Sequence, residues 1–191
     1  MSQEIEIEFK NLLTEEEFNK ILHTFSFPTE PFRQINHYFE TDDFGLKAQH
    51  AALRIREKDT RNILTLKEPH PDGLLETHDL LTEQEKAAWI ANKPIAKQNT
   101  LKQLNALHIN VDDLKYWGTL ITDRREMAYK DCTLVLDYST YGNTNDYEFE
   151  LEANNRTTGK KVFEEILRNT SIPQRKTPNK IKRFFKAVYR K

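Results

Sequence analysis

The sequence predicts an α+β protein: a closed or nearly closed, eight-stranded antiparallel β-barrel with helices packed outside it. First, stretches of alternating apolar and polar residues recur along the chain, as in half-buried strands. Second, the strands fall into two groups whose internal links have hairpin length, and such short links require antiparallel pairing. Third, helical stretches with apolar stripes separate and follow these groups. An even number of strands near eight is compatible with closure.

The first half of the chain supplies five of the expected strands. The first lies at residues 4–10, where isoleucine and phenylalanine alternate with charged residues. A helix follows, because Thr14 and Glu17 stand at the two positions of a capping box. The next strands are expected at 33–41 and near 51–58, 62–68 and 73–80.

The second half begins with a mostly helical insertion near 82–115, which Pro94 interrupts. Thr82 and Glu85 stand at the two positions of another capping box, so a helix is expected to begin there. The remaining strands are expected near 117–130, 132–139 and 147–152, and a helix near 158–169. A C-terminal helix is expected near 178–190, with Thr177 as its cap and Pro178 in its first turn. No boundary is visible, so residues 1–191 are expected to form a single domain.

Composition excludes several classes of protein. The 191 residues suit one domain with a real core. The net charge of -1 lacks the basic excess of a nucleic-acid-binding protein, and five glycines cannot build a Gly-rich phosphate loop. A single cysteine, no signal segment and no long apolar run predict a cytoplasmic protein without a membrane span.

Other reactive side chains give weaker signals. The six histidines are scattered without zinc-site spacing. Cys132 is interpreted as an ordinary strand residue, and Trp89 and Trp117 as packing residues.

The informative feature is the charge on the strand faces. Acidic residues alternate with apolar ones in the first and last strands, and basic residues do so in the strands between. A half-buried strand of an ordinary open sheet also alternates, so any one strand alone favours a solvated face. Three like charges on one strand face repel each other, however, unless something cationic neutralises them.

Two kinds of ligand explain this segregation of charge. Carboxylate oxygens are the ligands that Mg²⁺ and Mn²⁺ prefer, whereas arginine and lysine match phosphate oxygens. Acids for metal and bases for anion on one polar face describe a metal–polyphosphate site. If the sheet closes, that face lines the interior and the apolar residues point outward under the helices.

Several motifs now resemble those of one family. Glu6-x-Glu8-x-Lys10 resembles the N-terminal signature of the CYTH superfamily, the triphosphate tunnel metalloenzymes. Other segments resemble its later elements in order, although Glu40 replaces an aspartate and Asn179 a serine: His37–Thr41, Ala52–Arg56, Leu66-Lys67, Thr122–Arg124, Leu136-Asp137, Phe149–Glu152 and Lys180–Phe184. The resemblance spans nearly the whole chain. Within this family the chain resembles the YjbK-like proteins of Gram-positive bacteria, which are called adenylate cyclases or triphosphatases.

This resemblance implies a tunnel of eight strands and hydrolysis of a triphosphate, inorganic tripolyphosphate or a related small molecule, with Mg²⁺ or Mn²⁺. Two alternatives stay open: an adenylate cyclase that makes cyclic AMP from ATP, and a non-catalytic module that binds polyphosphate or a nucleotide. No nucleic-acid or membrane partner is expected, and the protein would be a monomer or homodimer.

The candidate residues divide by charge. The expected metal ligands are Glu6, Glu8, Asp137, Glu150 and Glu152. The expected phosphate-binding residues are Lys10, Arg54, Arg56, Lys67, Arg124, Lys180 and Arg183. Glu6, Glu8 and Lys10 are the catalytic candidates, with Glu8 or a second metal activating water.

Some charged residues are assigned elsewhere. Glu4 and Glu148 are expected at a solvated tunnel mouth, and Arg125, which has the opposite parity, on the outside. For Lys180 and Arg183 a basic surface helix remains as good an interpretation as a tunnel plug.

Overall fold

A computed structural model describes residues 3–189, and their contacts group into two compact units. The first unit comprises residues 3–5 and 34–120, and the second comprises residues 6–33 and 121–189. Each unit has its own hydrophobic core.

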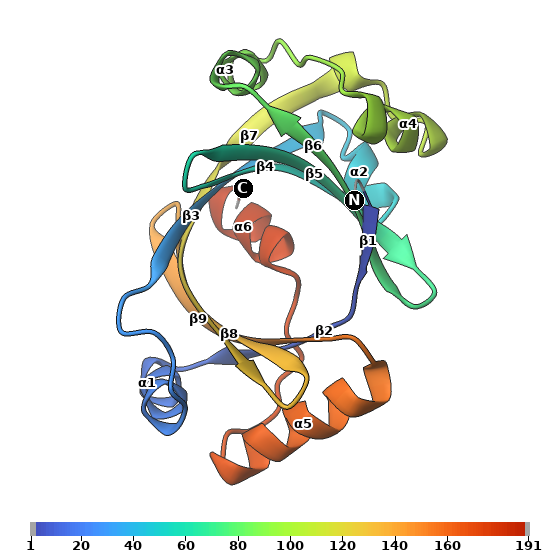
Figure 1. Cartoon of the computed structure of the whole chain (residues 1–191). Helices are drawn as coiled ribbons and strands as arrows, with labels where there is room; N and C mark the ends of the chain where they lie inside the picture. Colours follow the sequence, from blue (N-terminus) through green and yellow to red (C-terminus); the bar gives the residue numbers. More distant parts are fainter. Residues whose placement is uncertain (1–2, 190–191) are drawn as a thin grey trace. The chain divides into compact units, whose positions relative to one another are not determined.

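Within the described residues, nine strands form one sheet in the order β1-β6-β5-β4-β3-β7-β8-β9-β2 (Figure 1). The pairings β2–β9, β3–β4, β4–β5, β5–β6, β7–β8 and β8–β9 are antiparallel. The hairpin-length links from β4 to β5 to β6 and from β7 to β8 to β9 require this arrangement. The strands are β1 (Gln3–Glu6), β2 (Glu8–Leu13), β3 (Phe32–Thr41), β4 (Ala52–Lys58), β5 (Arg61–His70), β6 (Gly73–Leu81), β7 (Leu114–Tyr129), β8 (Cys132–Tyr141) and β9 (Thr144–Ala153).

The count of eight strands was wrong at one place. The strand predicted at 4–10 is divided into β1 and β2, with only Ile7 between them. β1 neighbours β6 at one end of the sheet order, and β2 pairs with β9 at the other end. The division follows because the chain changes its hydrogen-bonding partner at Ile7, and a continuous ladder cannot do so.

The core of the first unit lies between its sheet and the helices α3 (Glu83–Ile90) and α4 (Gln98–Ala106) (Figure 1). Trp89 of α3 is 1% exposed and packs edge-on against Phe39 of β3, with ring centroids 5.0 Å apart. The short helix α2 (Gly45–Ala48) adds Leu46 to this core. A 3-10 turn at Val111–Asp113 follows α4 in the chain. The segment predicted as a helical insertion thus contains the two short helices α3 and α4, and Trp89 is a packing residue, as predicted.

The core of the second unit lies between β2, β8 and β9 and the helices α1 (Glu15–Thr24) and α5 (Arg156–Asn169) (Figure 1). The rings of Phe149 on β9 and Phe163 on α5 stack 5.6 Å apart. In each unit the apolar strand residues thus lie under helices, as the sequence pattern predicted.

The predicted caps are right for two helices and wrong for the last. Thr14 and Thr82 each form the expected capping box. The C-terminal helix α6 (Lys180–Val188) begins after Asn179, not Thr177. The Thr177 hydroxyl, two residues before the N-cap, instead accepts a hydrogen bond from the Leu12 backbone N–H at 2.9 Å and donates one to the Arg175 carbonyl at 3.3 Å. No helix within residues 3–189 is long and apolar enough to cross a membrane.

Gly159 permits the close packing of α5 on the sheet. A Cβ at this position would lie 2.6 Å from the Ala153 Cβ and 2.8 Å from the Phe9 ring. Alanine normally favours a helix over glycine by roughly 1 kcal/mol. We expect Gly159→Ala nevertheless to lower the free energy of unfolding by about 1–3 kcal/mol, because overpacking outweighs helix propensity. Urea denaturation measures the change, with exposed Lys161→Ala as the control; a stabilised Gly159→Ala protein would contradict it.

Candidate metal and phosphate site

The acidic face of β9 lies in the second unit. Glu148, Glu150 and Glu152 alternate with residues of the hydrophobic core. In the antiparallel register Glu150 stands opposite Lys10 of β2, and Glu152 stands opposite Glu8. On the other side, Glu148 stands opposite Asp137 of β8. Pairing of three strands therefore gathers carboxylates that are far apart in the sequence.

Arg124 of β7 neutralises two of these carboxylates. Its guanidinium donates to both oxygens of Asp137, at 2.7 and 2.6 Å, and to Glu150 at 2.8 Å. Burial alone would lower the pKa of Arg124, but Asp137 and Glu150 raise it well above its usual value. Such a bidentate contact fixes the plane of the guanidinium as well as its charge.

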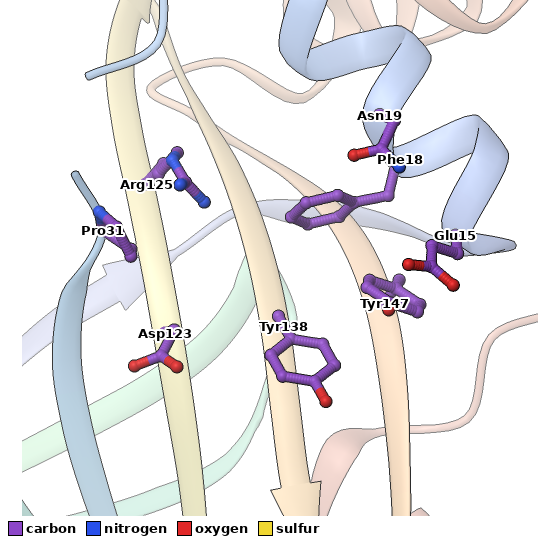
Figure 2. Close-up of a pocket in the computed structure, with 8 residues that line it drawn as sticks. All are labelled: Glu15, Phe18, Asn19, Pro31, Asp123, Arg125, Tyr138 and Tyr147. Atoms are coloured by element: carbon purple, nitrogen blue, oxygen red, sulfur yellow. The ribbon is translucent and has the colours of Figure 1, made fainter. Parts of the chain in front are cut away.

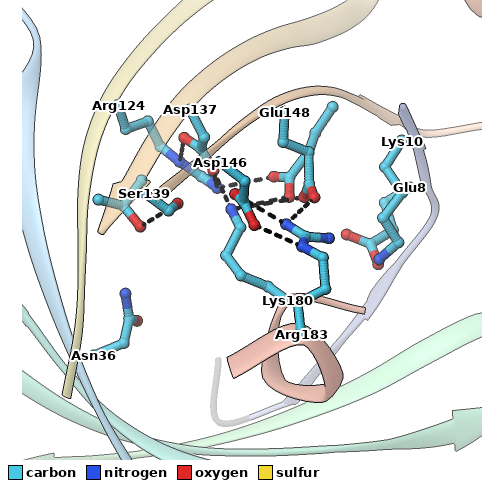
Figure 3. A network of polar contacts seen from close by, with 12 residues as sticks. Glu8, Lys10, Asn36, Arg124, Asp137, Ser139, Asp146, Glu148, Lys180 and Arg183 are labelled. Carbon is cyan, nitrogen blue, oxygen red and sulfur yellow. Dashed lines mark hydrogen bonds and ion pairs between the residues drawn. The ribbon is translucent and has the colours of Figure 1, made fainter. Parts of the chain in front are cut away.

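Helix α6 brings two more cations to the same acids (Figure 3). Lys180 pairs with Asp137, and its Nζ lies 3.4 Å from Glu150 and 3.6 Å from Glu148. Arg183 pairs with Glu148 and donates from Nε to Asp146 at 2.8 Å. The alternative of a solvated surface helix is therefore wrong, because these two cations face carboxylates.

The expectation of a solvated Glu148 is also wrong. Its side chain is 0% exposed, since α6 covers this part of β9 and Lys180 and Arg183 supply its counter-charges. Strand parity correctly predicted the face of Glu148 but could not predict that a distant helix covers it. Glu4, the other residue placed at a solvated mouth, is exposed as expected.

Burial and neighbouring charges shift the pKa values of the three β9 glutamates in different directions. Burial raises the pKa of Glu148, and Glu150 adds to the rise against the effect of Lys180. Burial would also raise the pKa of Glu150, but Lys180 and Arg124 hold it well below the usual value. Burial raises the pKa of Glu152 to about 7; Arg124 opposes this rise, whereas Glu6, Glu150 and Glu126 reinforce it.

The carboxylates gathered around Glu152 show whether a metal ion would fit here. Carboxylates that raise one another's pKa are stabilised when a cation binds among them. Their oxygen atoms are the donors that Mg²⁺ and Mn²⁺ prefer. The acids on β9, together with Glu6, therefore fit such an ion. Glu8 is paired with Lys10 on its own strand.

The first unit carries a separate group of cations on β4 and β5. Lys67 lies opposite Glu76 of β6, and its Nζ is 2.8 Å from Glu76 Oε1. Arg54 lies 3.7 Å from the same oxygen, and Arg56 donates to the side-chain oxygen of Asn36 at 3.2 Å. Burial alone would raise the pKa of Glu76, but Lys67 and Arg54 lower it to about 2.

Glu76 is a member of this group that the sequence analysis missed. The segment Leu74–Leu81 lacks the regular alternation that drew attention to other strands. The signal that could have found it is the hairpin register, which places Glu76 opposite Lys67.

The predicted site residues are thus divided between the two units. The first unit holds Arg54, Arg56 and Lys67; the second holds Glu6, Glu8, Lys10, Arg124, Asp137, Glu150, Glu152, Lys180 and Arg183.

Arg125 lies away from the acids, as its parity predicted. It donates from Nε to the Pro28 carbonyl and from Nη2 to the Thr29 carbonyl, both at 3.1 Å. It lines a hollow of about 270 Å³ together with Phe18 of α1 and Tyr147 of β9. Figure 2 shows these side chains. Arg125 therefore anchors the segment that leads into β3.

Comparison with known proteins gives one consistent result. The CYTH domain family matches residues 4–185. YjbK of Bacillus subtilis (strain 168), by its name a proposed triphosphatase, is 47% identical over 186 residues, which cover 97% of this chain and 96% of YjbK.

Solved structures agree. The protein in a crystal structure of a proposed adenylate cyclase from Bacillus halodurans is 44% identical to this chain, with a TM-score of 0.90. The match covers 97% of this chain and 100% of that protein's chain. HpAC1 from Hippeastrum, a proposed adenylyl cyclase with a dominant triphosphatase activity, is 22% identical to this chain, with a TM-score of 0.78. The match covers 94% of this chain and 95% of the HpAC1 chain. At that identity HpAC1 supports the fold alone.

Asp146 links α6 to the sheet. It accepts hydrogen bonds from Arg183 at 2.8 Å and from the Tyr141 hydroxyl at 2.5 Å. A hydrogen bond to a charged group contributes about 1.5–3 kcal/mol. We expect Asp146→Asn to speed amide hydrogen exchange in Lys180–Val188 about 10- to 100-fold without a comparable change in α5. The neighbouring exposed Asn145→Ala is the control, and unchanged exchange in α6 would contradict the role of Asp146.

Glu76 gives a pH-dependent contribution to stability. Because its pKa is lowered in the folded protein, this contribution is present above the ordinary value of 4.5 and is lost as pH falls towards 2. We expect Glu76→Gln to lower the free energy of unfolding by up to about 3 kcal/mol at pH 7, with the deficit shrinking below pH 4.5. Urea denaturation from pH 7 to pH 3 checks this, with exposed Glu16→Gln as the control. A deficit that is constant with pH would contradict it.

Proposed function

This chain belongs to the CYTH domain family, and we propose that it hydrolyses a small triphosphate with the help of Mg²⁺ or Mn²⁺. Inorganic tripolyphosphate or a related compound is the proposed substrate. The name of YjbK supports the reaction class.

The observation that carries the proposal is that buried acids in each unit are neutralised by buried or half-buried bases. In the second unit Arg124 and Lys180 pair with Asp137 and Glu150, and in the first Lys67 pairs with Glu76. A polyphosphate alone would take the cations and leave the carboxylates buried without partners, at a cost of several kcal/mol per charge. A metal ion alone would leave the cations unpaired. A metal–triphosphate complex satisfies both sets at once.

We also propose that the two units form one domain and that their sheet closes into the tunnel of the family. The sheet order supports this, because its two end strands, β1 and β2, are separated along the chain only by Ile7.

In the proposed reaction each group of residues has one task. Arg54, Arg56 and Lys67 bind phosphate oxygens, with Lys10, Arg124, Lys180 and Arg183 contributing from the second unit. These cations stabilise the negative charge that develops on the leaving pyrophosphate. Glu6, Asp137, Glu150 and Glu152 would hold the metal, and Glu8 would orient or deprotonate the attacking water. The metal would offset phosphate charge and lower the pKa of bound water.

The reaction is tested with purified protein, Mg²⁺ or Mn²⁺, and tripolyphosphate, ATP or thiamine triphosphate in separate assays. We expect tripolyphosphate to give orthophosphate and pyrophosphate. Cyclic AMP from ATP would overturn the proposal in favour of an adenylate cyclase, the activity proposed for the Bacillus halodurans relative. Tight binding without turnover in either metal would overturn it in favour of a binding module.

The metal assignment has a sharper test. We expect Glu6→Gln to lower kcat/KM for tripolyphosphate on the order of 100-fold or more, the size of effect seen when one electrostatic contact at a reacting centre is removed. The exposed Glu16→Gln of α1 is the matched control. If Glu6→Gln keeps wild-type activity in both metals, Glu6 is not a metal ligand.

A further inference from the structure

A histidine and two glutamates converge in the first unit. Glu4 lies on β1, and Glu76 and His78 lie on the neighbouring strand β6. One donor atom from each lies within 4.8 Å of the other two. His78 Nε2 is 3.2 Å from Glu4 Oε1 and 3.5 Å from Glu76 Oε2. This set shares no residue with the carboxylates of β8 and β9.

These separations are those of ligands around one ion. Donor atoms about 2.0–2.2 Å from a metal stand roughly 2.8–3.6 Å apart at coordination angles between octahedral and tetrahedral. Both distances from His78 fall in that range. His78 therefore already stands at a ligand's separation from both carboxylates, whose own oxygen atoms lie within 4.8 Å of each other.

The second nitrogen of His78 is already held. Its Nδ1 lies 3.0 Å from the hydroxyl of Thr65, which stands opposite it on β5 and is 3% exposed. Metal-binding histidines usually have their other ring nitrogen hydrogen-bonded in this way, which fixes the ring orientation. Because a hydroxyl can accept from Nδ1–H, the contact leaves Nε2 able to offer its lone pair to a metal.

The two carboxylate oxygens of Glu76 have different neighbours. Lys67 and Arg54 approach Oε1, whereas Oε2 faces His78. The side chain is only 7% exposed, so its position is fixed by packing as well as by these contacts. Glu4 is exposed, so the site has a route for an ion to enter from solvent.

We propose that Glu4, Glu76 and His78 bind a divalent transition-metal ion such as Zn²⁺. An imidazole nitrogen suits zinc and its neighbours, whereas Mg²⁺ favours sites built from oxygen donors. Three protein ligands leave at least one position for water or another oxygen ligand. The proposal does not depend on the proposed hydrolysis.

The test is zinc binding to chelator-treated, full-length protein, measured by calorimetry without any triphosphate. We expect His78→Ala and Glu4→Gln each to weaken Zn²⁺ binding at least about 10-fold. His23→Ala and Glu16→Gln, both exposed on α1, are the matched controls and should bind as the wild type does. Co²⁺ should give a visible absorption band in the wild type that His78→Ala loses.

Two results would overturn the proposal: no zinc binding to the wild type, or affinities of His78→Ala and Glu4→Gln equal to those of the controls. Circular dichroism in chelator checks that each variant is folded. If His78→Ala fails to fold, the exposed Glu4→Gln decides the question. Since no triphosphate is present, failure here leaves the proposed hydrolysis standing, and failure of hydrolysis leaves this site standing.

Discussion

The structure depends on one constraint: ionised side chains removed from water must be paired. Asp137 and Glu148 are completely buried, and a lone carboxylate in such a place would cost several kcal/mol. Arg124 and Lys180 remove that cost for Asp137. Lys180 and Arg183 offset only part of it for Glu148, whose pKa stays raised by burial. The conformation of α6 is therefore tied to the charge of a strand more than 30 residues away in the sequence.

The same constraint explains why each unit separates its two faces so completely. Apolar strand residues such as Leu53 and Phe149 are covered by helices, which leaves the charged residues to the opposite face. On that face acids and bases become neighbours, because strand pairing places residues from different parts of the chain directly opposite each other. The result is a polar surface with little unbalanced charge that still contains many strong ligands.

Such a surface is suited to ligands that carry charge of both signs. Exchange of an internal ion pair for a metal–anion complex keeps every buried group paired, so binding does not need to overcome an isolated buried charge. Glu76 illustrates the principle on a small scale, since one of its oxygens faces cations and the other faces His78.

The sequence by itself determined the strand pattern, the capping boxes of α1 and α3, and the faces of the alternating residues. These features depend on local periodicity and local hydrogen bonds, which a single chain displays directly. Tertiary structure alone decided three matters: the division of the first strand at Ile7, the burial of Glu148 beneath α6, and the convergence of Glu4, Glu76 and His78. Each of these depends on which distant segment becomes a neighbour. A scattered histidine and an unremarkable glutamate therefore gave no signal until sheet pairing brought them together.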